Sequence, residues 1–189
     1  MKFVTFLFLF SFPLLSSEKN IPADYKIKLK SKKEFTDSFK HLDGLLKLVN
    51  TSPEFTLYEA LPYRNKDLLQ KELQKDLIEK RYEFFFYKNT VKMKEKDLEM
   101  LKKSIFDKKS YSAFRGFKKC GGYKPTFSLY FHRCDVEVHI CLGCHEAKFF
   151  HKGKEVYCNY SHEGFQKIKD MLYLYRVNSP RRIMENPIK

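Results

Sequence analysis

The sequence lacks the residue patterns that identify most enzyme classes. It has no serine, histidine and aspartate set with the spacing of a hydrolase, no paired carboxylate motif, no phosphate-cradling glycine loop and no H-E-x-x-H segment. No catalytic residue is therefore nominated and no reaction follows from motifs. Whether the protein is an enzyme stays open, and a non-enzymatic protein is the favoured interpretation.

Long apolar runs are also scarce. The single one, Phe3–Leu15, is shorter than the roughly 20 residues that span a bilayer. With Lys2 before it and Ser16-Ser17 after it, this run has the parts of a secretory signal peptide. We expect residues 1–17 to be a signal peptide, and the mature protein to be exported, periplasmic or extracellular, with no transmembrane span.

Acidic residues are in the minority. The chain has 37 Lys and Arg against 23 Asp and Glu, which gives a formal net charge of +14. The basic residues are scattered rather than gathered in a block, and outside the cytoplasm nucleic acid is not an expected partner. The charge predicts at most a weak attraction to anionic envelope surfaces.

Linkers are missing as well, since no stretch rich in proline, glycine and serine divides the chain. Without residues 1–17 the chain keeps 172 residues (189 − 17), enough for one domain with a hydrophobic core. We predict an N-terminal extension over 18–54 with one amphipathic helix, a single α+β domain over 55–182, and a basic tail over 183–189.

Helical spacing of apolar residues recurs in four places. Ser31 to Glu34 has the form of a capping box, and apolar residues from Phe35 to Val49 follow at helical spacing, which predicts a helix over 32–49. Three further helices are expected: Lys66 to about Lys75 after an Asn65 cap, Lys94–Phe106, and one after a Ser161 cap. Extended segments are expected at Phe55–Leu61 and at Glu83–Tyr87, the latter with a turn at Lys88-Asn89-Thr90 and a return from Val91.

The region 126–158 alternates between apolar and polar residues around short turns. Turn residues stand at Arg133-Cys134, Leu142-Gly143 and Lys152-Gly153. This pattern predicts a four-stranded antiparallel meander packed by the amphipathic helices. With Leu142-Gly143 as a two-residue turn, the predicted cross-strand pairs are Cys141 with Cys144, Ile140 with His145, His139 with Glu146, Val138 with Ala147, and Glu137 with Lys148.

The segment Cys141 to His145 is the densest group of reactive side chains. Its C-x-x-C-H pattern is the attachment motif of a c-type haem, with Cys141, Cys144 and His145 as the residues involved. In haem proteins this motif usually begins a helix, whereas here strand-like alternation runs up to Cys141 and resumes after His145. The hairpin therefore favours two other interpretations, a disulfide or a metal site.

Cys120 is expected at the same end of the meander as this hairpin tip. Cys134 is expected at the opposite end, and Cys158 on the core face opposite Ala147. An exported protein usually oxidises its available thiols, so a structural disulfide between two of Cys120, Cys141 and Cys144 comes first. A zinc site of Cys120, Cys141, Cys144 and His145 comes second, and covalent haem or another redox role is the alternative. Five cysteines leave at least one without an intramolecular partner.

Several short motifs together resemble a family of uncharacterised exported bacterial proteins. They are Leu57-Tyr58-Glu59-Ala60-Leu61-Pro62, Cys120-Gly121-Gly122-Tyr123 with Pro125, Cys141-Leu142-Gly143-Cys144-His145-Glu146, and Leu174-Tyr175-Arg176 with Asn178 and Pro180. The resemblance covers about residues 55–182, implies that the three cysteines act as one site, and implies no activity. The chain departs from it in having Leu142 in place of the usual phenylalanine and Thr126 in place of the usual aspartate.

Overall fold

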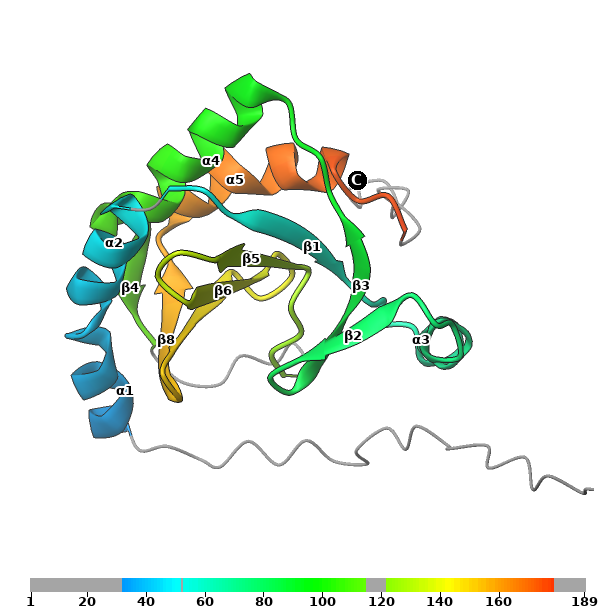
Figure 1. The fold of residues 1–189 in the computed structure, drawn as a ribbon. Helices are drawn as coiled ribbons and strands as arrows, with labels where there is room; N and C mark the ends of the chain where they lie inside the picture. Colours follow the sequence, from blue (N-terminus) through cyan, green and yellow to red (C-terminus); the bar gives the residue numbers. More distant parts are fainter. Residues whose placement is uncertain (1–31, 52, 115–121, 179–189) are drawn as a thin grey trace, which may run out of the picture.

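An antiparallel sheet forms the centre of the fold. The computed structural model describes residues 32–51, 53–114 and 122–178. Within them eight strands form one open sheet in the spatial order β2-β3-β1-β5-β6-β7-β8-β4 (Figure 1). In chain order they are β1 Thr56–Ala60, β2 Ile78–Arg81, β3 Phe84–Thr90, β4 Tyr111–Ala113, β5 Phe127–Phe131, β6 Val136–Cys141, β7 Glu146–His151 and β8 Lys154–Tyr160. The predicted α+β class is confirmed, but the predicted meander is only the central part, β5 to β8, of a wider sheet.

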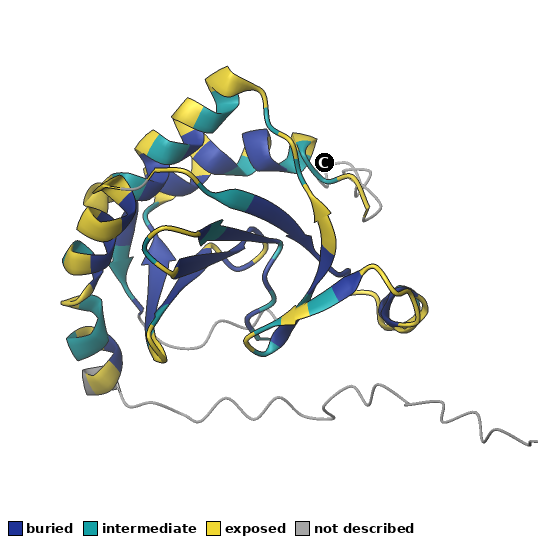
Figure 2. Ribbon diagram, viewed as in Figure 1, coloured by how far each residue is buried: buried dark blue, intermediate teal, exposed yellow. Residues whose placement is uncertain are grey.

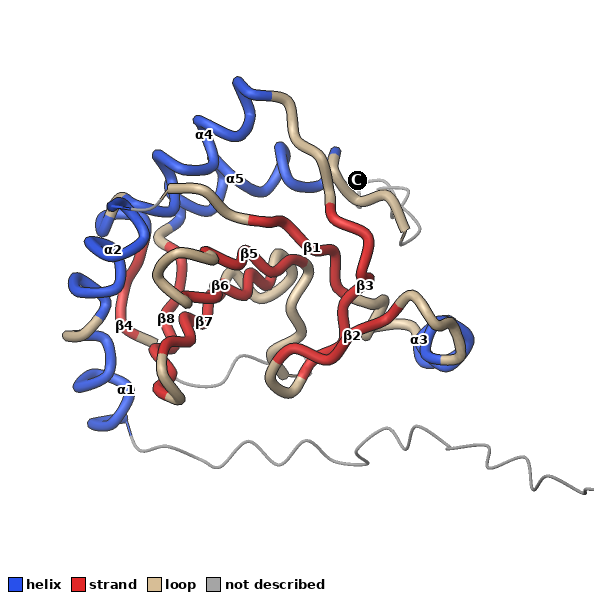
Figure 3. Tube along the Cα trace, in the orientation of Figure 1, coloured by secondary structure: helices blue, strands red, loops and turns tan. Residues whose placement is uncertain are grey.

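The helices are α1 Lys32–Phe39, α2 Leu42–Thr51, α3 Lys66–Leu73, α4 Glu95–Phe106 and α5 His162–Leu174, with a short 3-10 helix η1 at Lys108–Ser110. Three of them, α2, α4 and α5, cover one face of the sheet, while α3 lies beside β2 and β3 (Figure 3). Apolar side chains of α2, α4 and α5 pack on β5 to β8 in one cluster, the outer core, which includes Val49, Ile105 and Phe165. The face predicted to be apolar, with Val138 and Ile140, is this one.

The first helical region consists of two helices rather than the one predicted over 32–49. The chain turns at Lys40 and His41, whose amides donate to Asp37 O at 3.3 Å and Ser38 O at 3.0 Å. The break lets Phe35 pack against Phe114 and Tyr157 while the residues of α2 join the outer core. Residues 32–51 thus belong to the same folded body as the sheet.

Two predicted helix caps are confirmed. Asn65 Oδ1 accepts the Leu68 amide at 3.0 Å before α3, and Ser161 Oγ accepts the Gly164 amide at 3.1 Å before α5. Each satisfies a backbone donor that has no partner within the helix.

The turn predicted at Lys88-Asn89-Thr90 is wrong. The chain reverses earlier, at Tyr82 and Glu83, between β2 and β3, and Tyr82 takes a φ of 51° there. Lys88 to Thr90 instead continue β3, which pairs with both β2 and β1. Because the chain reverses before Phe84, the three consecutive phenylalanines 84–86 lie in one continuous strand.

The loop between β6 and β7 has four residues, Leu142 to His145, instead of the predicted two-residue turn. The His145 amide closes it by donating to Cys141 O at 3.1 Å, and His145 has a φ of 59°. The predicted cross-strand pairs are therefore wrong by two residues. The observed pairs are Cys141 with Glu146, Ile140 with Ala147, His139 with Lys148, Val138 with Phe149, and Glu137 with Phe150. Because a shift of two residues keeps each side chain on its face, the predicted sorting of faces holds.

The sheet curls, so that its second face is enclosed. The ring of Tyr82 in the β2–β3 turn stacks on Phe150 of β7, with centroids 4.0 Å apart. Every residue of β6 is buried, including Glu137 and His139, and the central strands are dark along their length in Figure 2. The face expected to carry complementary charges thus lies inside the protein.

Some predictions concern residues outside the described ranges. They include the signal peptide at 1–17, the cap at Ser31, Cys120 and the tail at 183–189. Among the helices that the structure describes, none combines the length and apolar character that a bilayer crossing requires.

Candidate functional site

Cys141 and Cys144 come together at the tip of the β6–β7 hairpin. Cys141 is the last residue of β6, and the Cys144 amide donates to its Sγ at 3.2 Å. Both side chains are buried, and Cys144 Sγ donates to Gly122 O at 3.5 Å. The hairpin tip is therefore joined through sulfur to the segment that follows Cys120.

The surroundings of Cys141 favour its thiolate. Its pKa lies below the ordinary value of a thiol, chiefly because of a side-chain hydrogen bond with Cys144. Burial acts in the opposite direction, and the backbone N–H groups of Lys124 and Cys144 add two further favourable hydrogen bonds. Backbone donors aimed at one sulfur are suited to a metal-bound or reactive thiolate.

His145 does not face this pair of thiols. Its ring stacks on Phe165 of α5, with centroids 3.6 Å apart, on the side of the outer core. Cys141 and Cys144 instead belong to the cluster on the enclosed face. The structure thus brings together two of the four predicted metal ligands, with Cys120 outside the described residues. Among the residues that are described, no group of three or more His, Cys, Asp or Glu could hold a metal ion.

The two other described cysteines lie where they were predicted. Cys134 lies in the β5–β6 turn, at the opposite end of the sheet, and Cys158 pairs with Ala147 across β7 and β8. Burial raises the pKa of the Cys158 thiol far above its ordinary value, so this residue behaves as a small apolar side chain.

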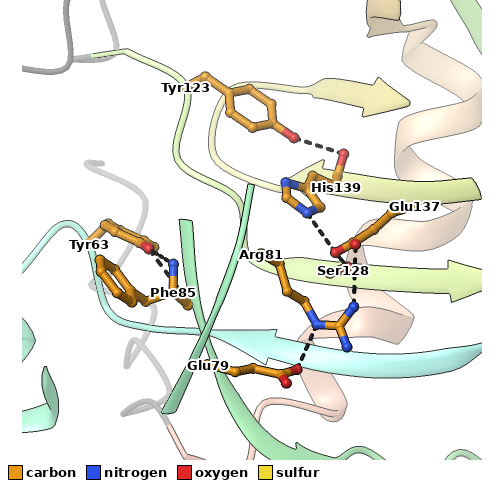
Figure 4. Close-up of polar contacts among 8 residues, drawn as sticks. All are labelled: Tyr63, Glu79, Arg81, Phe85, Tyr123, Ser128, Glu137 and His139. Carbon is orange, nitrogen blue, oxygen red and sulfur yellow. Dashed lines mark hydrogen bonds and ion pairs between the residues drawn. The ribbon is translucent and has the colours of Figure 1, made fainter. Parts of the chain in front are cut away.

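A buried polar cluster occupies the enclosed face (Figure 4). Glu137 is at its centre: its Oε1 accepts from Ser128 Oγ at 2.5 Å and contacts His139 Nε2 at 2.9 Å. Arg81 Nη1 lies 3.3 Å from Glu137 Oε2, and Arg81 Nε lies 2.6 Å from Glu79 Oε1. Tyr123 closes this region by donating its hydroxyl to His139 O at 2.8 Å.

The order of these groups does not suit nucleophilic catalysis. A serine nucleophile needs the imidazole next to it as base, with the carboxylate behind. Here the carboxylate of Glu137 stands between Ser128 and His139, so the serine proton points to a carboxylate that is already paired. Burial raises the pKa of Glu137, but hydrogen bonds from His139 and Ser128 and the charge of Arg81 outweigh it and lower the pKa overall. The cluster is best described as a buried carboxylate, that of Glu137, whose charge is stabilised by Arg81 and by hydrogen bonds.

A second buried cation lies beside this cluster. Lys148 Nζ is 3.1 Å from Glu83 Oε1 and 3.3 Å from Glu155 Oε2, and it lies over the rings of Tyr123 and Tyr157 at 5.0 and 5.2 Å. Its side chain is only 3% exposed. The alternation of apolar and polar residues predicts that Lys148 lies on the polar face. Nothing in the sequence near Lys148 indicates Glu83 as its partner.

Glu59 and Thr126 come from the motifs that carry the resemblance. The buried Glu59 accepts at Oε2 from Val177 N at 2.9 Å, Asn178 N at 2.7 Å and Asn178 Nδ2 at 3.0 Å. Thr126 Oγ1 accepts the Leu142 amide at 3.2 Å. These side chains fasten the segments after α5 and before β5 to the hairpin-tip end of the sheet.

Comparisons with known proteins add no relative. A scan against protein-family models, a search of curated proteins and a search of solved structures each found no match to this chain. Functional inference consequently rests on the geometry described above.

Proposed function

We propose that this chain is an exported, non-enzymatic protein in which Cys120 and the hairpin pair Cys141 and Cys144 form one structural site. The first form of the proposal is a disulfide between Cys120 and one of the pair. It would link the segment leading into β5 to the β6–β7 tip. Residues 1–17 support the export, and the +14 charge supports no more than weak attraction to anionic envelope surfaces.

The observation that carries the proposal is the contact between Cys144 Sγ and Gly122 O at 3.5 Å. Cys120 precedes Gly122 by two residues, and consecutive Cα atoms are about 3.8 Å apart. The covalent chain therefore keeps the Cα atom of Cys120 within about 7 Å of the Cα atom of Gly122. A disulfide requires the Cα atoms of its two cysteines to lie within about 7 Å, and this short tether allows Cys120 to come that close to Cys144.

Metal binding by the same cysteines is the second candidate. The backbone donors aimed at Cys141 Sγ support it, because they stabilise a thiolate and zinc binds thiolates. Covalent haem is not favoured by the geometry, since the His145 ring packs on Phe165, away from the two thiols.

The test uses the full chain exported by its host. Peptide mapping after alkylation in denaturant should show Cys120 linked to Cys141 or Cys144, with Cys134 and Cys158 alkylated as free thiols. One bound zinc with Cys120, Cys141 and Cys144 protected until a chelator is added would support the second form. Five free thiols without metal would overturn both, and a haem absorption band that persists in denaturant would establish the alternative.

A matched pair of variants measures the contribution of the link. Cys120→Ser should lower the free energy of unfolding by about 2–4 kcal/mol under oxidising conditions and have a smaller effect in reductant. Cys134→Ser, which removes a cysteine from the opposite end of the sheet, should change it by less than about 1 kcal/mol.

A further inference from the structure

A pocket of about 540 Å³ opens beside the hairpin tip. Its walls come from four separate parts of the chain: residues 60–68, which run from the end of β1 into α3, residues 124–126, Gly143, and the end of α5 with Arg176. The volume lies within the range of small-molecule sites in proteins, roughly 300–1,000 Å³. The pocket can therefore admit an organic molecule as well as a bare ion.

The charged residues that line the pocket are all basic. They are Arg64, Lys66, Lys124 and Arg176. In the described part of the chain, no ion pair engages Arg64, Lys66 or Lys124. Arg176 forms an ion pair with the fully buried Glu59, whose Oε1 lies 3.7 Å from Arg176 Nε. A concave surface lined by cations alone raises the local concentration of anions.

The Arg64 guanidinium can lie at the pocket wall because Gly143 has no side chain. A Cβ atom at this glycine would lie 1.8 Å from Arg64 Nη2 and 2.4 Å from its Cζ. The guanidinium therefore lies directly against the hairpin-tip backbone. This position keeps a planar group with several N–H donors at the pocket, where it can bind a carboxylate or phosphate through two hydrogen bonds.

The remaining wall is preorganised. The Tyr63 hydroxyl accepts the Phe85 amide and donates to Phe85 O at 3.3 Å, and its ring meets Phe84 edge-on at 5.7 Å. Pro62 and Pro125 add rigid apolar surface. Asn65 caps α3 at this wall, which turns the positive end of that helix toward the pocket. A fixed wall lowers the entropic cost of binding.

We propose that this pocket binds a small organic anion, whose phosphate or carboxylate group is held by Arg64, Lys124 and Arg176. The flat or apolar part of the ligand lies on Tyr63 and the two prolines. Among the described residues, no cysteine lines the pocket.

The test is a titration of the isotope-labelled full chain at about 0.15 M salt, followed by backbone amide NMR. The probes are phenyl phosphate, benzoate and inorganic phosphate, with phenol as the neutral control. We expect saturable shifts at Arg64, Thr126 and Gly143 with phenyl phosphate or benzoate, at least about tenfold weaker binding of inorganic phosphate, and no binding of phenol. Absence of saturable pocket shifts with all three anions would overturn the proposal.

Two variants and a control localise the binding. Arg64→Gln should weaken binding of the organic anion by about tenfold or more, the loss expected for one charge-assisted contact. Gly143→Ala should weaken it similarly, because its methyl group displaces only the end of the Arg64 side chain and Gly143 does not have a positive φ. Combining the two should add little, since both act through one group.

The control is Arg133→Gln, which makes the same change in net charge in the β5–β6 turn at the other end of the sheet. It should leave the affinity unchanged. Equal weakening by Arg133→Gln and Arg64→Gln would show diffuse attraction to a basic protein and would refute a built site.

Discussion

Lys148 Nζ on β7 lies 3.1 Å from Glu83 Oε1 in the β2–β3 turn, although three strands separate β3 from β7 in the sheet. The ion pair spans the enclosed face and therefore depends on the curl of the whole sheet. Lys148 Nζ also pairs with Glu155 on β8, so this one buried cation joins the β2–β3 turn, β7 and β8.

Replacing Lys148 by Met should destabilise the protein strongly. The change takes the Lys148 cation away from Glu83 and Glu155, and breaking a buried ion pair from one side costs about 3–5 kcal/mol. Both glutamates keep some solvent contact, so we expect about 3 kcal/mol by urea denaturation. Lys40→Met removes an exposed pair with Asp37 and should cost less than about 1 kcal/mol. Equal losses in the two variants would contradict the role given to Lys148.

Stability should fall as the pH decreases below neutrality, with His139 contributing. Burial lowers the pKa of His139 in the folded protein, and Glu137 offsets this only in part. The unfolded chain takes up the proton near the ordinary pKa of about 6.5, so acid favours unfolding. The pKa of Glu137 is also lowered and extends the loss of stability to lower pH.

The measurement for this prediction is urea denaturation at pH 7.5 and pH 5.0. The drop in the free energy of unfolding should be smaller in His139→Gln than in the parent protein. His162→Gln, at an exposed position at the start of α5, should keep the parent drop. An unchanged drop in His139→Gln would show that other groups carry the acid sensitivity.

Two glycines should respond in opposite directions to alanine. At Gly164 a Cβ would lie 2.7 Å from Ser110 Cα, a backbone atom that cannot move aside easily, so Gly164→Ala should cost about 1–3 kcal/mol. At Gly44, inside α2, nothing lies within 4 Å, and Gly44→Ala should stabilise by about 0.5–1 kcal/mol. Thermal or urea denaturation of the two variants checks both signs, and a gain at Gly164 would show that α5 and η1 are not in close contact.

The sheet could be predicted from the sequence where its pairing is local. Alternation through Val136, Val138 and Ile140, followed by a turn, predicts consecutive antiparallel strands, and β5 to β8 are such strands. The position of β1 could not be predicted in this way. It pairs with β5 across about 70 residues of sequence, and no local pattern encodes that partner.

The candidate site likewise has a part that could be predicted from local sequence and a part that could not. The pair Cys141 and Cys144 follows from its spacing, and both thiols lie at the hairpin tip as expected. The predicted register of β6 and β7 is wrong by two residues. Leu142-Gly143 indicates a two-residue turn, and nothing in the sequence indicates the four-residue loop in which His145 has a positive φ. The contact of Arg64 with Gly143 depends on how two loops meet, so nothing near either residue in the sequence indicates it.

The two edges of the described sheet have a consequence for self-association. β2 has four residues and carries Glu79, Lys80 and Arg81, and β4 has three residues beside α1. Such short edge strands offer little unpaired backbone to a strand from another molecule, and charged side chains oppose the approach on the β2 side. The longer strands, which would form the most persistent intermolecular ladder, lie between two neighbours in the order of the sheet, although β4 pairs only with Cys158, Asn159 and Tyr160 of β8.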